Sequence, residues 1–226
     1  MRKYLEIVLP WGKYVYNKMS MGLKISADVF QRELSMLFQN MPYILVYIDD
    51  ILVITKRSYE QHLQTVEKVL EKLQEAGMQL NIDKSHVATV AVDYLDYIIS
   101  CEGIKPQPTK VHLIVVMPRP KTSTQVKRFS GMINFYRNLW EKRAHYLVPI
   151  NTLTRNKKKG IIIWSSEAEK VFEDIKKIVA EDAMLHYPDF NQAFEIHTDS
   201  SDYQMGVIIS QKGRPVAFWS KKLSYT

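Results

Sequence analysis

The fold is decided by the stretch YILVYIDDILVI, which occupies residues 43–54. Two short apolar runs, rich in β-branched and aromatic residues, flank the adjacent pair Asp49-Asp50. Such runs predict a β-hairpin with the two aspartates at its tip. Asp-Asp is a poor sequence for a two-residue hairpin turn, which favours Asn-Gly or Asp-Gly, and adjacent carboxylates repel by about 1 kcal/mol even in water. The pair is therefore either a solvated acidic turn or a site for a divalent cation.

A cation would turn the repulsion between Asp49 and Asp50 into attraction. Mg²⁺ is usually held by one or two carboxylates together with substrate phosphates, and two such ions can stabilise the attacking and leaving oxygens of phosphoryl transfer. An isolated Asp-Asp pair is more often a solvated turn, so the choice between the two interpretations depends on the surrounding sequence.

Helices are predicted on both sides of the hairpin. Upstream, Ser26 is placed to cap a helix over residues 26–38, whose apolar positions fall on one face. Downstream, Ser58 and Gln61 have the spacing of a capping box, and the helix that they open is expected to end at Gly77.

The rest of the chain is expected to pass from strands to helices and back to strands. The predicted elements are strands at residues 78–82 and 87–100, a boundary at the prolines between 106 and 120, helices beginning at Thr122 or Ser123, near Lys142 and at the capping box Ser166/Glu169, and strands at 194–198, 205–210 and 215–220 with a tight turn at Lys212-Gly213.

Charge is unevenly distributed along the chain. The net charge is +7, yet residues 103–163 contain thirteen Lys/Arg and the single acid Glu141, which leaves −5 for the remainder. A basic block of this kind indicates either a nucleic-acid-binding surface or a solvated pair of basic helices. No stretch approaches the ~20 apolar residues of a membrane span, and Cys101, the only cysteine, excludes internal disulfides and cysteine-rich zinc sites.

Tyr47-Ile48-Asp49-Asp50 closely resembles the Tyr-x-Asp-Asp motif of reverse transcriptases, and its flanks resemble the gypsy-type family of LTR retrotransposons. The resemblance covers essentially all 226 residues and keeps the family's order and spacing. The matching segments are Met19-Ser20-Met21-Gly22-Leu23-Lys24, Phe30-Gln31, Leu80-Asn81-Ile82-Asp83-Lys84, the primer-gripping hairpin Tyr94-Leu95-Asp96-Tyr97-Ile98-Ile99-Ser100, Gly103-Ile104, Pro118-Arg119-Pro120, and Gly131 through Arg137.

The resemblance implies roles for individual residues. Asp49 and Asp50 would be catalytic residues and ligands of Mg²⁺ or Mn²⁺. Asp199 would be the first metal-binding carboxylate of a ribonuclease H domain, although an Asp that ends a strand is by itself more often a turn residue. The residues implied to bind nucleotide or template are Met21, Gly22, Lys24, Gln31, Tyr47 and Lys84, and those implied to hold the nucleic-acid backbone are Lys127, Arg128 and Arg137.

The fold that the resemblance implies is α+β, in three parts. Residues 1–104 would form part of a right-hand polymerase palm, a βαβ unit with the catalytic hairpin and the primer-gripping region. Residues 105–187 would form the basic helical thumb and connection, and residues 188–226 the first strands of a ribonuclease H-like α/β domain.

The implied function is RNA-directed DNA polymerisation by two-metal nucleotidyl transfer, with a ribonuclease H domain following. The expected partners are an RNA and DNA template-primer duplex, deoxynucleotide triphosphates and the rest of the retrotransposon polyprotein, with no membrane. We expect an intracellular protein, in a cytoplasmic particle or the nucleus, and not a secreted one.

Departures from the family pattern lead us to expect incomplete active sites. A third polymerase carboxylate belongs upstream of Met19, where Glu6 is the only acid and does not match, and the next nuclease acids belong beyond Thr226. We therefore expect the chain to be inactive alone; the alternative is a non-catalytic remnant that acts at most as a basic nucleic-acid-binding module. Met21, Ile25, Ala27 and Asp96 also differ from the family, and Asp96 places a negative charge where primer phosphates would repel it.

Overall fold

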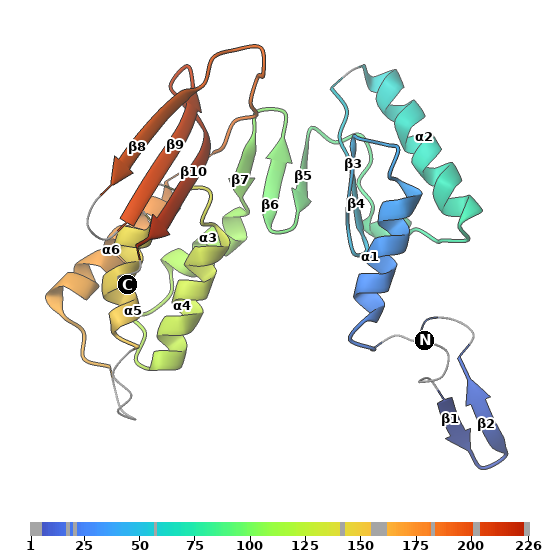
Figure 1. Ribbon diagram of the computed structural model, residues 1–226, viewed down its shortest axis with the longest axis horizontal. Helices are drawn as coiled ribbons and strands as arrows, with labels where there is room; N and C mark the ends of the chain where they lie inside the picture. The colour runs from blue at the N-terminus through green and yellow to red at the C-terminus, as the bar shows by residue number, and fades with distance from the viewer. Residues whose placement is uncertain are drawn as a thin grey trace. The chain divides into compact units, whose positions relative to one another are not determined.

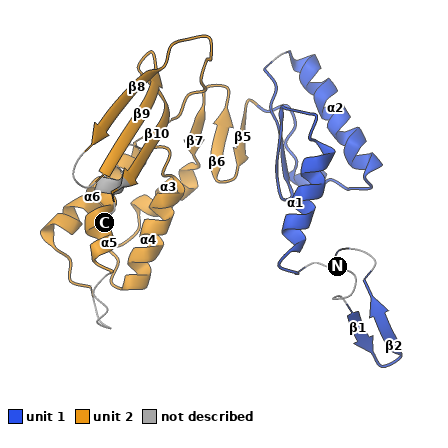
Figure 2. Cartoon of the chain, in the orientation of Figure 1, with its two compact units in different colours: residues 1–89 blue, residues 90–226 orange. Residues whose placement is uncertain are grey.

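The computed structural model describes residues 6–16, 19, 22–56, 58–140, 143–154, 162–181, 184–200 and 204–223. The chain divides into two compact units, Met1–Thr89 and Val90–Thr226, and each is described by itself (Figure 2). Both contain helices and antiparallel strands, so the mixed α+β character is confirmed. No helix among the described residues is long and apolar enough to cross a membrane.

Unit 1 is built around the predicted hairpin (Figure 1). Its core is formed where one helix and the first hairpin strand meet a second helix, through the buried side chains Leu34, Phe38, Ile44, Val69 and Leu73. The elements are β1 (Glu6–Leu9), β2 (Gly12–Val15), α1 (Ser26–Leu37), β3 (Ile44–Tyr47), β4 (Asp50–Val53), α2 (Tyr59–Glu75) and the 3₁₀ helix η2 (Ile82–Lys84).

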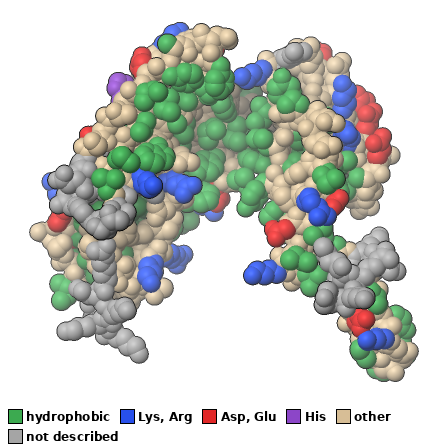
Figure 3. Space-filling view, viewed as in Figure 1, with side chains coloured by type: hydrophobic (Ala, Val, Ile, Leu, Met, Phe, Trp, Pro, Cys, Tyr) green, Lys and Arg blue, Asp and Glu red, His purple; other side chains and the backbone are tan. Residues whose placement is uncertain are grey.

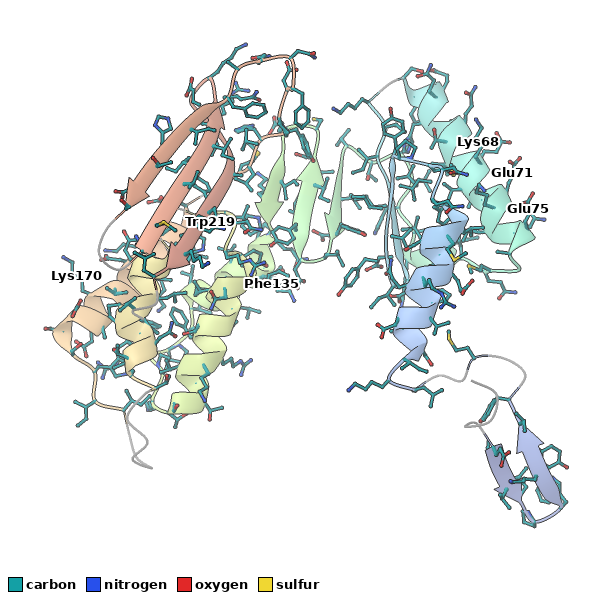
Figure 4. All side chains as sticks on the ribbon, in the orientation of Figure 1. Lys68, Glu71, Glu75, Phe135, Lys170 and Trp219 are labelled. Atoms are coloured by element: carbon teal, nitrogen blue, oxygen red, sulfur yellow. The ribbon has the colours of Figure 1, made fainter. Side chains whose placement is uncertain are left out.

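The helix α2 buries one face and exposes the other, as the spacing of its apolar residues predicts. Val69 and Leu73, four residues apart, are buried. Figure 4 shows Lys68, Glu71 and Glu75 projecting from the opposite side. Ser58 caps the first turn by accepting a hydrogen bond from the Gln61 N–H, and the helix gives way to Gly77 at φ +68°, a conformation that glycine adopts without strain.

Two predictions for unit 1 are wrong in detail, and one hairpin was missed. Ser26 does not cap α1: Ile25 occupies the N-cap position and makes no side-chain cap bond. Residues 78–82 form no strand, because the chain enters the exposed 3₁₀ helix η2 at Ile82. The hairpin of β1 and β2 was not predicted, since its short strands are exposed along their length and lack an alternating pattern.

Unit 2 places four helices between two three-stranded antiparallel sheets along the chain (Figure 1). The first sheet has the order β5-β6-β7 and the second the order β10-β9-β8. The elements are β5 (Ala91–Tyr94), β6 (Tyr97–Ser100), β7 (Ile104–Pro106), α3 (Pro108–Val115), α4 (Ser123–Phe135), α5 (Arg143–Thr152), α6 (Ser166–Ala180), β8 (Glu195–Ser200), β9 (Gln204–Gln211) and β10 (Arg214–Lys222).

The core of unit 2 lies among its helices. Phe129 of α4 and Phe172 of α6 are almost fully buried, with ring centroids 4.8 Å apart. Ile133 and Ile150 have no exposed surface at all. The segment before α6 is joined to this core by Trp164, whose indole N–H donates to the Pro120 carbonyl at 2.9 Å.

In unit 2 the observed N-cap residues differ in part from those predicted, and one helix was not predicted at all. Thr122, not Ser123, caps α4 in a full capping box with Gln125. Ser165 caps α6 in place of the predicted Ser166/Glu169 box. α3 was missed because the prolines that surround it indicate a boundary, yet a proline at the first helical position of α3 is compatible with a helix.

The C-terminal strands agree with prediction. β9 and β10 contain the predicted segments 205–210 and 215–220 and extend beyond them, and β8 runs from Glu195 to Ser200 where a strand was predicted at 194–198. Lys212 and Gly213 form the turn between β9 and β10 with φ values of +51° and +72°.

A hydrogen-bonded joint connects the two sheets of unit 2. Ile104 and Leu185 each donate a backbone hydrogen bond to the other at 2.9 Å, and the N–H of His186 donates to the Pro215 carbonyl at 2.9 Å. A side chain at Gly103 would collide with the Leu185 carbonyl, so this approach requires glycine.

Replacing Ile133 by alanine should destabilise unit 2 by about 2–5 kcal/mol, because the side chain is fully buried and its removal leaves a cavity. Ile163→Ala is the matched control, since Ile163 is 90% exposed and its truncation should change stability by less than about 0.5 kcal/mol. Urea unfolding followed by tryptophan fluorescence measures both. Equal effects of the two substitutions would contradict this account of the core.

Candidate active site and nucleic-acid interface

The two aspartates occupy different positions in the hairpin. Tyr47 pairs with Asp50 as the last register pair of β3 and β4, so the turn consists of Ile48 and Asp49. Asp49 therefore lies in the turn and Asp50 is the first residue of β4. Both are exposed, as is Tyr47, at 52%. The predicted hairpin is confirmed, and it brings the two carboxylates to one exposed end of unit 1.

The backbone of this turn is strained. Ile48 has φ +52°, a region that β-branched residues adopt only rarely. Such a residue costs about 1–3 kcal/mol and persists only where its surroundings enforce it. The strain falls on the residue directly before Asp49, so whatever maintains the Ile48 conformation also orients the first carboxylate.

The side chain of Gln31 in α1 contacts this turn. Its Oε1 accepts a hydrogen bond from the Ile48 N–H, and its Nε2 donates to the Val46 carbonyl at 3.0 Å. Nε2 also lies 3.0 Å from the hydroxyl of Ser35, one turn further along α1. The amide of Gln31 is therefore occupied by the hairpin backbone and by its own helix.

The residues at the hairpin end fit a divalent cation. Within the described part of the chain neither Asp49 nor Asp50 forms an ion pair, and no group of three or more His, Cys, Asp or Glu side chains is gathered in one place. Adjacent exposed carboxylates suit Mg²⁺ or Mn²⁺, which take one or two protein carboxylates and complete their coordination with phosphates and water.

The other residues implied to contact nucleotide or template lie on short segments of unit 1. Gly22, before α1, has φ +85° with open space around it, a conformation that favours glycine. Lys24 is exposed just before α1, and Lys84 is exposed at the end of η2. Met21 lies outside the described residues. Of this group, Gln31 and Tyr47 are the residues that the structure brings to the aspartates.

The turn of the predicted primer-gripping hairpin, Leu95-Asp96, joins β5 to β6. Its φ values are +51° and +65°, and Asp tolerates this region better than most residues. The Asp96 carboxylate lies 3.1 Å from the Lys110 ammonium of α3. The negative charge that was expected to repel primer phosphates is therefore paired with a cation.

Two tyrosines fix the Leu95-Asp96 turn to α4. The Tyr136 hydroxyl donates to the Asp96 carbonyl at 3.2 Å, and the Tyr97 hydroxyl donates to the Phe135 carbonyl at 3.1 Å. The Tyr97 ring stacks on Phe135, the last residue of α4, with ring centroids 5.7 Å apart; Phe135 is labelled in Figure 4. Burial, with the nearby Asp96 charge adding to it, raises the pKa of Tyr136 to about 12.

These contacts between the Leu95-Asp96 turn and the end of α4 were not predicted from the sequence. Tyr97 and Phe135 are 38 positions apart in the chain, and only the fold brings them together. The signal that was available was a pair of adjacent aromatic residues, Phe135-Tyr136, at the end of a predicted amphipathic helix.

Cations of the basic block divide into paired and available ones. Lys110 and Arg119 form ion pairs with Asp96 and Glu169. Lys127 and Arg128 of α4, and Arg137 just beyond it, are exposed and form no ion pair within the described residues. Figure 3 shows Lys and Arg side chains on the surface over α4.

Asp199, the candidate ribonuclease H carboxylate, lies near the end of β8. It pairs in register with Gly206 of β9 and is exposed. Asp199 belongs to unit 2, and the Asp49-Asp50 pair belongs to unit 1.

Comparisons with known proteins agree with these observations. A family model described as "Reverse transcriptase (RNA-dependent DNA polymerase)" matches residues 1–99, and one described as "RNase H-like domain found in reverse transcriptase" matches residues 164–226. The chain is 34% identical over 232 residues to the retrovirus-related Pol polyprotein from transposon opus of Drosophila melanogaster, covering 95% of this chain and 23% of that protein. It is 30% identical over 224 residues to the Pol polyprotein from transposon gypsy of the same organism, covering 94% of this chain and 22% of that protein.

Solved structures show the same fold. The foamy viral protease-reverse transcriptase in complex with dsDNA matches with a TM-score of 0.84 at 24% identity, covering 99% of this chain and 47% of that chain. The fold class predicted from the sequence, a partial reverse transcriptase polymerase followed by an RNase H-like region, is thereby confirmed. The chain spans less than a quarter of the length of the curated relatives given above. Successive family matches and relatives along nearly the whole chain show that it belongs to the reverse transcriptase family, among the gypsy-type LTR retrotransposon Pol polyproteins, with an RNase H-like region after the polymerase region.

Proposed function

We propose that this chain contributes the catalytic hairpin and the duplex-holding helices of an RNA-directed DNA polymerase. The observation that carries the proposal is the exposed Asp49-Asp50 pair on a hairpin whose strained turn is held from α1. Bound Mg²⁺ or Mn²⁺ would neutralise charge on the attacking and leaving oxygens of nucleotidyl transfer. Asp49 and Asp50 would hold the metal, and the exposed Tyr47, Lys24 and Lys84 would contact nucleotide or template.

The chain's own residues would divide the remaining work. Gly22 leaves open space at its Cα, so that backbone and nucleotide can approach closely. Polymerases of the family that the chain resembles use a third carboxylate. Asp49 and Asp50 would therefore form only part of the polymerase metal site. The 226-residue chain by itself would then be inactive in extension.

The surface of α4 is proposed to hold the backbone of a template-primer duplex. Lys127 and Arg128 of α4 and Arg137 just beyond it are exposed, and Tyr97 and Tyr136 fix the Leu95-Asp96 turn to the C-terminal end of the same helix. The similar solved structures are of a protease-reverse transcriptase in complex with dsDNA and with an RNA/DNA hybrid, which supports a duplex as the partner. Deoxynucleotide triphosphates would be the second substrate.

The sheet β8–β10 is proposed to begin a ribonuclease H domain, with Asp199 as a metal-binding carboxylate. The RNase H-like family match to residues 164–226 supports this assignment. The division into a palm (1–104), a thumb and connection (105–187) and a ribonuclease H-like part (188–226) remains a prediction.

Asp49→Asn, made in the polyprotein that carries this chain, should abolish Mg²⁺-dependent primer extension on an RNA template, because an amide does not replace a carboxylate ligand. Glu71→Gln is the charge-matched control on the outer side of α2 and should leave extension unchanged. Extension by Asp49→Asn at a near-normal rate would contradict the metal-ligand assignment.

The double substitution Lys127→Ala/Arg128→Ala should weaken duplex binding and flatten its salt dependence. Each lost phosphate contact lowers the slope of log affinity against log salt by about one. Lys170→Ala, on the exposed surface of α6, provides the control (Figure 4). Fluorescence anisotropy with a labelled duplex at 50 to 200 mM salt measures the slopes. If the double variant keeps the wild-type slope, α4 does not hold the duplex.

Lys110→Ala should weaken duplex binding by less than about fivefold, since an exposed ion pair is worth up to ~1 kcal/mol and its loss leaves Asp96 unpaired beside the duplex. Adding Asp96→Asn should restore the affinity, because no uncompensated charge then remains. The same anisotropy assay applies. A double variant that binds as weakly as Lys110→Ala would show that Lys110 contacts phosphate directly and does not act by neutralising Asp96.

A further inference from the structure

We propose that Gln31 is a positioning residue that holds the strained Ile48-Asp49 turn in the conformation needed for metal binding. The family resemblance implies instead that Gln31 lines the template and nucleotide region. The inference rests on the proposed function, because it assigns Gln31 a task at the metal site of Asp49 and Asp50.

The geometry of the amide carries the inference. Successive peptide groups of a strand point in opposite directions, so the groups on either side of Tyr47 that are not directed at β4 are the Val46 carbonyl and the Ile48 N–H. Gln31 donates to the first and accepts from the second. A side-chain amide thus does what the peptide group of a neighbouring strand would do.

This pairing acts where the backbone needs support. Ile48 is the residue at φ +52°, and its N–H is one of the two groups that Gln31 binds. The other group, on Val46, belongs to the regular part of β3. The amide therefore links the strained residue to the strand that precedes it and fixes the direction in which the chain enters Asp49.

Gln31 is itself well fixed. It is half-buried, one turn before the buried Leu34 of α1, and its Nε2 also meets the Ser35 hydroxyl at 3.0 Å. A template base would have to replace these hydrogen bonds to bind the same amide. The structure thus favours a role that acts through Asp49 over direct contact with nucleic acid.

Mn²⁺ binding to the 226-residue chain tests the proposal without requiring extension. Gln31→Met keeps the length of the side chain and removes both hydrogen bonds to the hairpin. We expect the Mn²⁺ dissociation constant, measured by electron paramagnetic resonance of the free ion, to rise about 10-fold, as for other residues that orient metal ligands. Gln64→Met, the same substitution at an exposed position of α2, should bind Mn²⁺ like the wild type.

Two further measurements separate positioning from general stability. Amide hydrogen exchange should show faster exchange at Ile48 in Gln31→Met, with the amides of β4 and the thermal midpoint unchanged. Ile48→Gly removes the strain, since glycine adopts positive φ freely, so the effect of Gln31→Met on Mn²⁺ affinity should shrink in that background. Should Gln31→Met not fold, Gln31→Asn, whose amide is one methylene shorter, gives the same comparison.

The outcomes distinguish the two proposals. Wild-type Mn²⁺ binding equal to that of Asp49→Asn would overturn the proposed metal site, and the role of Gln31 with it. Mn²⁺ binding that depends on Asp49 but is unaffected by Gln31→Met would overturn the positioning role alone. Equal effects of Gln31→Met with and without Ile48→Gly would also overturn it, because the residue would then act independently of the turn.

Discussion

The packing of α1 against β3, the first strand of the hairpin that carries Asp49 and Asp50, is the constraint on which the candidate polymerase site depends. Leu34 of α1 and Phe38, just after it, are buried with Ile44 of β3, and this contact sets the distance between helix and strand at which the Gln31 amide reaches the hairpin edge. The apolar packing thus positions the Gln31 hydrogen bonds, and these hydrogen bonds hold the strained turn at Ile48. The exposed carboxylates add nothing to the core; they depend on it for their orientation.

Unit 2 also contains a turn with positive φ values that side-chain hydrogen bonds stabilise, here from tyrosines. The Leu95-Asp96 turn also has positive φ values, and it is stabilised by tyrosine hydroxyls that donate to backbone carbonyls on either side of the contact with α4. In both units a turn with unfavourable backbone geometry lies at a proposed nucleic-acid contact, and side chains from a packed helix hold it there. Strain at such turns is expected where function sets the backbone shape.

Patterns of apolar and polar residues in the sequence predicted many of the elements, including β8, which is exposed along its length. The hairpin, α2, α4, α6 and the strands β8–β10 were all expected near their observed positions. α3 and the β1–β2 hairpin were missed, because proline punctuation hides the first and full exposure removes the alternation of the second. The N-cap positions Ile25 and Ser165 each lie one residue before the predicted one. At α6 two adjacent serines could cap and the fold selects the first, whereas Ile25 has no side chain that can cap α1.

Residue types at the candidate site were predictable from the motif, whereas their partners were not. The Asp49-Asp50 pair and Gln31 stand out in the sequence, but the bond between Gln31 and Ile48 spans 17 positions and depends on how α1 packs. The ion pair of Asp96 with Lys110 likewise reverses an expectation that treated Asp96 as an isolated charge. Charge counting over the basic block overestimates the cations available to a duplex, since Lys110 and Arg119 are already paired.

The joint between Ile104 and Leu185 has a mechanical consequence for unit 2. Reciprocal backbone hydrogen bonds, packed at a glycine that admits no side chain, couple the sheet that carries the Leu95-Asp96 turn to the segment leading into β8. Rotation of one sheet against the other would break these hydrogen bonds, so the joint opposes it. The Leu95-Asp96 turn and Asp199 thus lie in two sheets that are joined by backbone hydrogen bonds as well as by the chain between them.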